Sequence, residues 1–324
     1  MTSTTNARGR SGKSILRIGG IVVVALAALT GISAATHAST TASERSTLAP
    51  YGQTLTLSSG DINVYRNGGS GQTIVLLSGF GTAAPAIDFA PLIRELDNFD
   101  VIVVEGFGYG YSDTDVADRT IENITSELHE VLTRLEVDDQ VILVGHSAGG
   151  LYAHYYSNAY PDEVAAVIGI DPMVAKSGSL EVGTPSTAEG VQNMLGLFRL
   201  ATTIVPDLIQ PPGTAYTLGE RQQTAAMTNW NYGNVSISDE WSHLGANSTK
   251  AAAAPFAAAL PVLEVLSSES IATIPEWRSS HEAELAGVTT HRLEVLDGSH
   301  YLHWTQASAL GRIMADFIAT HVTG

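Results

Sequence analysis

Residues 141–150 read Val-Ile-Leu-Val-Gly-His-Ser-Ala-Gly-Gly, and the rest of the chain is interpreted outward from them. Four β-favouring apolar residues run into a serine between glycines, and a helix-compatible segment follows. A G-x-S-x-G motif has meaning only in this strand–turn–helix setting, where the turn holds the serine hydroxyl above the end of a sheet. We therefore expect no room for a Cβ at Gly145 or Gly149. We also expect Ser147 to be a nucleophile, with the Ala148 N–H pointing at the group that it attacks.

Length and composition are typical of a globular protein with a large core. The chain has 324 residues, of which 44% are hydrophobic and 15% are charged, which argues against a disordered protein. The formal net charge of −17 argues against a nucleic-acid partner, because binding to phosphate requires a basic surface. There is no cysteine, which excludes disulfides and thiolate metal sites.

The N-terminal segment has the pattern of a secretory signal. An apolar run, residues 18–35, is followed by small residues and preceded by four cations, Arg8, Arg10, Lys13 and Arg17. We expect residues 1–38 to be a signal peptide, cleaved after Ala35 or Ala38, or else an uncleaved membrane anchor, since the run is long enough to span a bilayer. Both alternatives place the folded part outside the cytoplasm, secreted in the first case. The Ser/Thr-rich residues 39–50 are interpreted as a linker.

The remaining pattern predicts an α/β domain over residues 51–324. Alternating segments at 54–57 and 62–66 predict a β-hairpin, and unbroken apolar runs predict buried strands at 73–77, 101–104, 141–144 and 164–170. The sheet is expected to resume with strands at 261–266 and 291–296. Helical spacing of apolar residues predicts helices at 86–97, 121–135, 276–285 and 307–320. This order predicts a mostly parallel eight-stranded sheet with helices on both faces.

Residues of about 173–255 interrupt this pattern. Strand-like runs disappear there, and short helical segments such as 191–200 lie between stretches rich in Gly, Pro, Thr and Ala. We interpret this part as a helical cap inserted into the sheet domain.

Four separated motifs carry a resemblance to the α/β-hydrolase fold over about residues 52–322. They occur in the order of that superfamily: Ser78-Gly79-Phe80-Gly81, Glu105–Ser112, Gly145–Gly149 and Gly298-Ser299-His300. Within the superfamily the chain looks like the single-domain, cap-bearing serine esterases and lipase-like hydrolases. Haloalkane dehalogenases resemble it in layout but have an aspartate at the position of Ser147. The resemblance implies the fold and the class of mechanism, and it implies no particular substrate.

A serine nucleophile requires a base, and His300 is the candidate. It follows the last predicted strand, in the Ser…acid…His order of this fold. His146 is interpreted as packing, and His303 lacks a third ligand that would make a metal site, so we expect no metal. For the oxyanion we expect the N–H of Ala148 and, from the resemblance, the N–H of Phe80.

The triad acid has two candidates. Asp171 ends the strand after the nucleophile helix, where haloalkane dehalogenases and some serine hydrolases place their acid. In many relatives the acid follows a later strand. In this chain the corresponding position is occupied by Ser270, and Glu269 lies one residue before it. We prefer Asp171 and keep Glu269 as the alternative; the simplest other role of Asp171 is to cap the turn before Pro172.

The leading functional interpretation is a secreted serine hydrolase that cleaves a small-molecule carboxylic ester and needs no cofactor. One alternative is an aminopeptidase or amidase with the same triad, in which cap acids bind a substrate ammonium; the candidates are Glu181, Glu189 and Glu220. Another is a catalytically silent hydrolase fold used for binding. We expect contact with a membrane only through an uncleaved anchor. The alternating glycines in 105–112 lack the spacing of a dinucleotide site.

Overall fold

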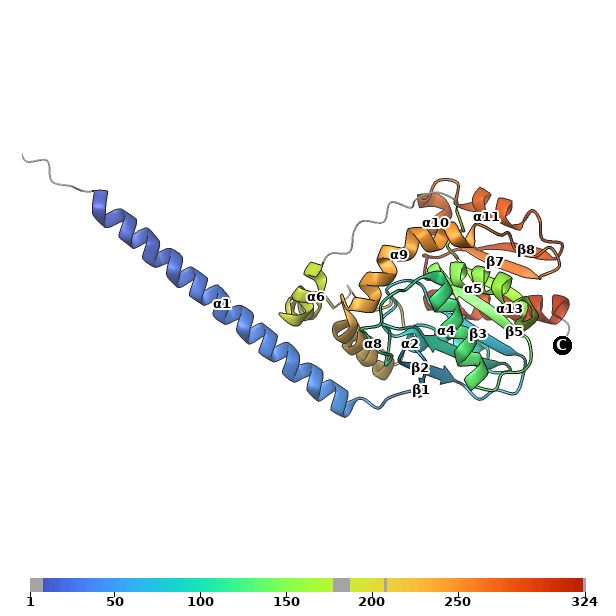
Figure 1. Ribbon diagram of the computed structural model, residues 1–324, viewed down its shortest axis with the longest axis horizontal. Coiled ribbons are helices and arrows are strands. Elements are labelled where there is room, and N and C mark those ends of the chain that lie inside the picture. Colours follow the sequence, from blue (N-terminus) through green and yellow to red (C-terminus); the bar gives the residue numbers. More distant parts are fainter. Residues whose placement is uncertain (1–7, 177–186, 207–208, 323–324) are drawn as a thin grey trace, which may run out of the picture.

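A computed structural model describes residues 8–176, 187–206 and 209–322, and shows a mixed sheet covered by helices on both faces (Figure 1). The eight strands lie in the order β1-β2-β4-β3-β5-β6-β7-β8. The strands β1 (Gln53–Thr56) and β2 (Asp61–Arg66) pair in antiparallel fashion, β2 pairs antiparallel with β4, and all other pairs are parallel. These others are β3 (Thr73–Leu77), β4 (Asp100–Glu105), β5 (Val141–His146), β6 (Val164–Ile170), β7 (Val262–Ser267) and β8 (His291–Leu296). The predicted sheet is confirmed.

The central strands are buried on both faces, which explains their unbroken apolar runs. Every residue of β4, β5 and β7 is buried. One face packs on α4 (Ile121–Arg134), α5 (Ala148–Ala159) and α11 (Trp277–Leu285), through side chains such as Leu128, Tyr156 and Leu285. The other face packs on α3 (Ala90–Glu95) and α13 (Ala307–His321), through Leu92 and Phe317. Short helices complete the chain: α2 (Pro85–Asp88), η1 (Pro161–Glu163), α10 (Ser268–Thr273) and α12 (Leu302–Thr305).

The single helix predicted over 86–97 is wrong, because the structure divides it into α2 and α3 at Phe89. Pro91 has no N–H to donate and its ring obstructs the preceding turn, so it fits only at the start of a new helix.

The described part of the insertion is helical. It contains α6 (Thr187–Met194), α7 (Leu197–Ile204), α8 (Leu218–Asn231) and α9 (Val235–Ala251). The helix predicted over 191–200 is divided at Gly196, whose φ of 72° lies in the left-handed region. A Cβ at Gly196 would also lie 2.6 Å from the carbonyl oxygen of Ser33. The division is therefore caused by close packing against the N-terminal helix.

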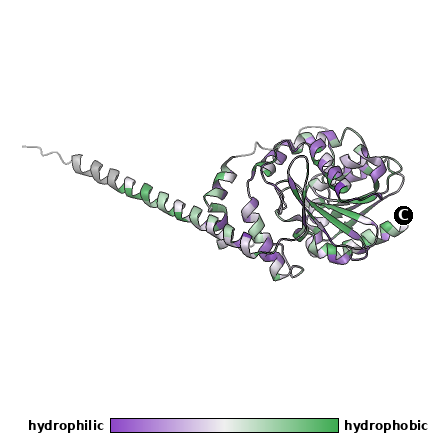
Figure 2. Cartoon of the chain, turned by 60° about the horizontal axis from the view of Figure 1, so that its bottom comes forward, coloured by the Kyte–Doolittle hydropathy of each residue, from purple (hydrophilic) through white to green (hydrophobic). Residues whose placement is uncertain are grey.

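The N-terminal helix α1 (Arg8–Thr47) projects from the domain (Figure 1), and its outer part is strongly apolar (Figure 2). Among the described residues, Ile18–Thr47 forms the one helical stretch long and apolar enough to cross a membrane. The helix includes residues 39–47, where we expected an unstructured linker. Contact with the cap stabilises this part, because Glu44 accepts a hydrogen bond from Arg199 of α7.

Candidate active site

Ser147 occupies a strained turn between β5 and α5. Its φ of 51° and ψ of −122° are rare for a residue with a side chain. A Cβ at Gly145 would lie 2.5 Å from the Gly149 carbonyl oxygen, and one at Gly149 would lie 2.3 Å from that of Leu77. The prediction that both positions exclude a Cβ is confirmed. Because neighbouring backbone packs this tightly, the turn is held in one geometry.

Backbone hydrogen bonds fasten this turn to the end of β6. The Ser147 carbonyl accepts from the N–H groups of Gly150 and Met173, at 2.9 and 2.8 Å. The Ser147 N–H donates to Ile170 at 3.3 Å. Asp171 directly follows Ile170, so the serine and this carboxylate lie at the same edge of the sheet. The Ser147 hydroxyl is partly exposed, and within the described chain it has no hydrogen bond to His300.

The structure brings Asp171 and His300 together. The Oδ2 of Asp171 lies 2.7 Å from the Nδ1 of His300, the Asp171 side chain is fully buried, and 30% of the His300 side chain is exposed. A carboxylate at Nδ1 selects the tautomer in which Nε2 carries the lone pair. The imidazole therefore has a fixed orientation and an available Nε2.

Asp171 has a dense set of hydrogen-bond donors besides His300. Its oxygens accept from the Ser267 N–H at 3.0 Å and hydroxyl at 2.9 Å, from the Ser270 hydroxyl at 2.5 Å and from the Trp277 Nε1–H at 2.9 Å. Burial by itself would raise the pKa of Asp171, but the hydrogen bonds from His300, Ser270, Ser267 and Trp277 outweigh it and lower the pKa. The carboxylate is therefore ionised at neutral pH. Sequence reasoning missed Ser267 and Trp277, for which no local signal exists.

Glu269, the alternative acid, is exposed and contacts the backbone of the histidine loop. Its Oε2 accepts from the His300 N–H at 3.0 Å, and its own N–H donates to the Gly298 carbonyl. The hydrogen bond to the imidazole ring is made by Asp171.

The loop after β3 passes directly over the serine turn. A Cβ at Gly79 would lie 2.9 Å from both the Nδ1 of His146 and the Cβ of Ser147. This closeness brings Phe80 next to the nucleophile, and Ala148 is buried as the first residue of α5. The loop is fastened by the Gly81 N–H, which donates to the Tyr109 hydroxyl at 3.1 Å.

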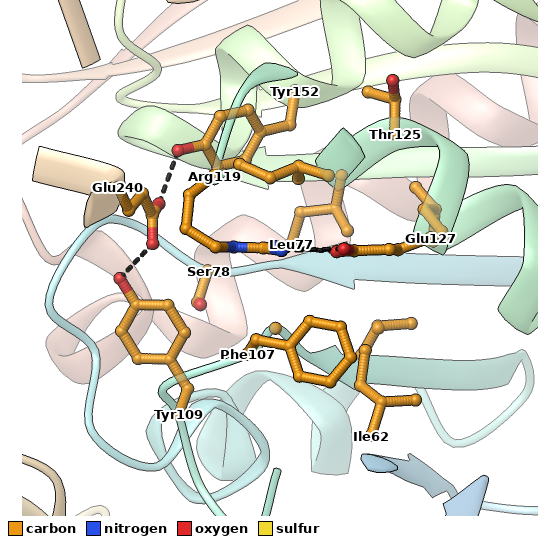
Figure 3. Close-up of a pocket in the computed structure, with 14 residues that line it drawn as sticks. Ile62, Leu77, Ser78, Phe107, Tyr109, Arg119, Thr125, Glu127, Tyr152 and Glu240 are labelled. Atoms are coloured by element: carbon orange, nitrogen blue, oxygen red, sulfur yellow. Dashed lines mark hydrogen bonds and ion pairs between the residues drawn. The ribbon is translucent and has the colours of Figure 1, made fainter. Parts of the chain in front are cut away.

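A buried polar network lies behind this loop and connects it to the cap (Figure 3). The Tyr109 hydroxyl donates to Glu240 of α9 at 2.7 Å, and the Tyr152 hydroxyl of α5 donates to the other Glu240 oxygen at 2.5 Å. Burial raises the pKa of Glu240, although both tyrosine hydrogen bonds oppose the shift. Arg119 and Glu127 form a bidentate pair in the same region, at 2.8 and 2.7 Å, beside a cavity of about 60 Å³. No local sequence pattern predicts this network.

A larger groove of about 260 Å³ adjoins the site. Its lining includes Gly81 of the loop over Ser147, Tyr301 next to His300, and the cap residues Ile209, Tyr216 and Thr228. The groove therefore lies between the sheet domain and the cap, beside the loops that carry Phe80 and His300.

Three other residues considered from the sequence, His146, His303 and Glu220, have structural partners. His146 is buried, with its Nε2 3.2 Å from the His300 carbonyl oxygen, and His303 Nε2 lies 2.6 Å from Asp88. Glu220 caps α8 and pairs with Arg94 at 2.7 Å. Glu189 is exposed, and Glu181 lies outside the described residues.

The chain belongs to the α/β hydrolase fold family, whose sequence model matches residues 72–240, just over half of the chain. It is a hydrolase of this family.

Two curated relatives and one solved structure illustrate the similarity. The uncharacterized protein YbdG of Bacillus subtilis is 25% identical over 330 residues, covering 94% of this chain and 98% of that protein. Lipase 1 of Psychrobacter immobilis is 30% identical over 141 residues, covering 43% of each chain. The epoxide hydrolase VrEH1 of Vigna radiata superposes with a TM-score of 0.66 at 16% identity, covering 83% of this chain and 97% of that one, and therefore shows the fold alone.

Proposed function

We propose that this protein hydrolyses carboxylic esters outside the cytoplasm through an acyl-enzyme on Ser147. The observation that carries the proposal is the 2.7 Å contact between Asp171 and His300 Nδ1, at the sheet edge where Ser147 projects from its strained turn. The basic and apolar N-terminal pattern supports the location.

In this mechanism Asp171 holds His300 so that Nε2 accepts the Ser147 proton as Oγ attacks the ester carbonyl. The tetrahedral oxyanion is stabilised by the N–H groups of Phe80 and Ala148. His300 then returns the proton to the leaving alcohol, and a water activated by the same imidazole releases the acid. Each oxyanion donor contributes about 3–4 kcal/mol in comparable enzymes.

The two alternatives have less support. An aminopeptidase needs free acids in the cap. Of the three candidates, Glu220 is committed to the α8 N-terminus and Arg94, Glu189 is exposed, and Glu181 lies outside the described residues. A silent binding protein would not require Ser147, His300 and Asp171 to be kept together. The similarity to the lipase of Psychrobacter immobilis supports an ester substrate.

The test is to label the purified protein with a fluorophosphonate probe and to assay Ser147→Ala. We expect the label on Ser147, and loss of ester turnover on the order of 10⁶-fold in the folded variant, because the nucleophile is removed. Ser279→Ala, an exposed serine on α11, is the matched control and should keep both properties. Near-normal turnover of folded Ser147→Ala would refute the serine mechanism. A panel of p-nitrophenyl esters against aminoacyl anilides separates esterase from amidase.

A further inference from the structure

We propose that α1 is retained as a membrane anchor and that the outer face of α6 and α7 rests on the bilayer, so that the ester substrate is a membrane lipid. The choice of lipid as substrate rests on the proposed ester hydrolysis. The anchor and the docking face rest on the contacts between α1 and the cap and on the side chains that these contacts leave exposed.

One face of α1 packs on the folded domain along residues 30–44. The partly buried residues recur every three or four positions, as one face of a helix requires: Thr30, Ser33, Ala34, His37, Thr40, Thr41 and Glu44. Residues 18–29 are exposed all round. The packed face begins upstream of both predicted cleavage positions, after Ala35 and after Ala38. A segment removed on secretion has no reason to fit the mature domain, so this face favours retention.

Specific contacts fasten α1 to the cap. The Arg199 guanidinium of α7 forms a bidentate pair with Glu44 at 2.7 and 2.8 Å, and also donates to Thr41 at 3.1 Å and to His37 at 3.2 Å. The Trp230 Nε1–H of α8 donates to the same Glu44 carboxylate at 2.9 Å. These partly buried, charge-assisted hydrogen bonds hold α1 in one orientation relative to the cap.

The length of α1 places the cap at the membrane surface. The 18 residues of the run 18–35 extend about 27 Å as a helix, close to the ~30 Å thickness of a hydrocarbon core. Arg8, Arg10, Lys13 and Arg17 lie at the end that would face the cytoplasm, in agreement with the positive-inside rule. Gly196, between α6 and α7, packs against Ser33 near the other end of the run. The two cap helices therefore lie at the level where the bilayer ends.

These helices expose the side chains that such a position requires. Between 42% and 72% of each of the following residues is exposed: Val191, Met194, Leu197, Leu200 and Ile204. On α7 the exposed large apolar residues are spaced at i, i+3 and i+7, whereas Arg199 and Thr202 face α1 and α8. Exposed apolar residues beside a membrane-spanning helix fit insertion into the lipid interface. We call Leu197, Leu200 and Ile204 the docking stripe.

Two adjoining grooves lie between this region and the loops of the active site. A groove of about 460 Å³ between α1, α7 and α8 shares Ile209 and Gln210 with the groove of about 260 Å³ that reaches Gly81 and Tyr301. Within the proposal, these grooves are where the acyl chain of a lipid would enter the cap.

The first experiment tests the docking stripe in the full-length protein. The variant Leu197→Asp/Leu200→Asp/Ile204→Asp is compared with Ile274→Asp, an exposed apolar residue directly after α10 and outside α6 and α7. Fatty-acid release from dioleoylphosphatidylcholine vesicles should fall at least tenfold in the triple variant alone, and turnover of soluble p-nitrophenyl butyrate should change less than twofold. Equal losses on both substrates, or unchanged vesicle hydrolysis, would overturn the docking face. Absence of butyrate turnover in the unaltered protein would instead refute the proposed ester hydrolysis.

The second experiment needs no activity. Because the chain has no cysteine, Leu200→Cys and Ile274→Cys each provide a single labelling site. An environment-sensitive fluorophore should shift to the blue on these vesicles at position 200 and not at position 274; the same response at both would overturn the docking face. Intact mass of the membrane fraction should include residues 18–35, and a chain beginning between Thr36 and Ser43 in the medium would overturn the anchor.

Discussion

Asp171 shows how a single buried carboxylate remains charged in this protein. Removing a carboxylate from water disfavours the ionised form, yet four residues donate hydrogen bonds to Asp171 and lower its pKa. One donor is Ser270, which stands where many relatives have their acid. In this chain the segment after the later strand supplies a donor at 2.5 Å, and the carboxylate that contacts His300 Nδ1 directly follows β6.

If Asp171 is the triad acid, two isosteric substitutions should lower ester turnover by unequal amounts. Asp171→Asn should lower turnover by roughly 10⁴-fold, since the amide presents the wrong group to His300 Nδ1. Glu269→Gln should cost little, because the Glu269 carboxylate accepts from the backbone N–H of His300, a role that the amide oxygen of Gln can also fill. Ester kinetics of both variants, with matched thermal unfolding, provide the measurement. A larger loss of turnover in Glu269→Gln than in Asp171→Asn would assign the role of triad acid to Glu269.

The lowered pKa of Asp171 also predicts a dependence of stability on pH. An acid whose pKa is lower in the folded state stabilises the fold above its unfolded pKa, about 3.9 for Asp. That contribution is lost as the pH falls through the folded value. The difference in free energy of unfolding between the unaltered protein and Asp171→Asn should therefore shrink in acid, measured by urea unfolding at pH 7 and about pH 3. A difference that grows in acid would contradict this account.

Among the helices and loops, the contact of α9 with the loop over Ser147 has the clearest functional consequence. Glu240 of α9 accepts from Tyr109, and the Tyr109 hydroxyl accepts from Gly81, next to the proposed oxyanion donor Phe80. Tyr109 is thus a positioning residue through which the cap supports the loop.

Tyr109→Phe removes both of these hydrogen bonds and leaves buried Glu240 with one tyrosine donor. We expect about 1–3 kcal/mol lower stability from the unsatisfied group. Turnover should also fall, by about tenfold, with little change in KM, because a donor to the oxyanion acts mainly in the transition state. Tyr152→Phe is the matched control, since it removes the other donor to Glu240 without touching Gly81. Equal kinetic effects in the two variants would argue against positioning.

Across the whole molecule, two apolar cores share one sheet. Phe317 of α13 is fully buried in one core, and Tyr156 of α5 is fully buried in the other. Because both cores pack against the same strands, neither can form without the sheet.

Phe317→Ala should therefore destabilise the entire domain by about 3–5 kcal/mol through the cavity that it leaves. Thermal unfolding should remain a single transition at a lower temperature. Ile274→Ala, an exposed control, should stay within about 0.5 kcal/mol of the unaltered protein. Two separate transitions would show that the cores unfold independently.

The sequence alone was sufficient to predict the sheet. For strands such as β3 and β6 the reason is burial on both faces, which requires a continuous run of apolar residues. The runs predicted at 73–77, 164–170 and 291–296 coincide with β3, β6 and β8. The turn at Ser147 was equally readable, since its glycines are required by backbone within a few residues or on the adjacent strand. The roles of Ser147, His300, Asp171, Phe80 and Ala148 remain predictions for the experiments above.

Tertiary structure determined what depends on residues far apart in the chain. Residues 39–47 are polar enough to suggest a linker, and they are helical where Glu44 meets Arg199, 155 positions later. Tyr109 and Glu240 are 131 positions apart, and no sequence pattern near either residue predicts that they are in contact. Hydrophobic periodicity records which side of an element is buried, whereas the partner of a buried polar group is set by how the elements pack.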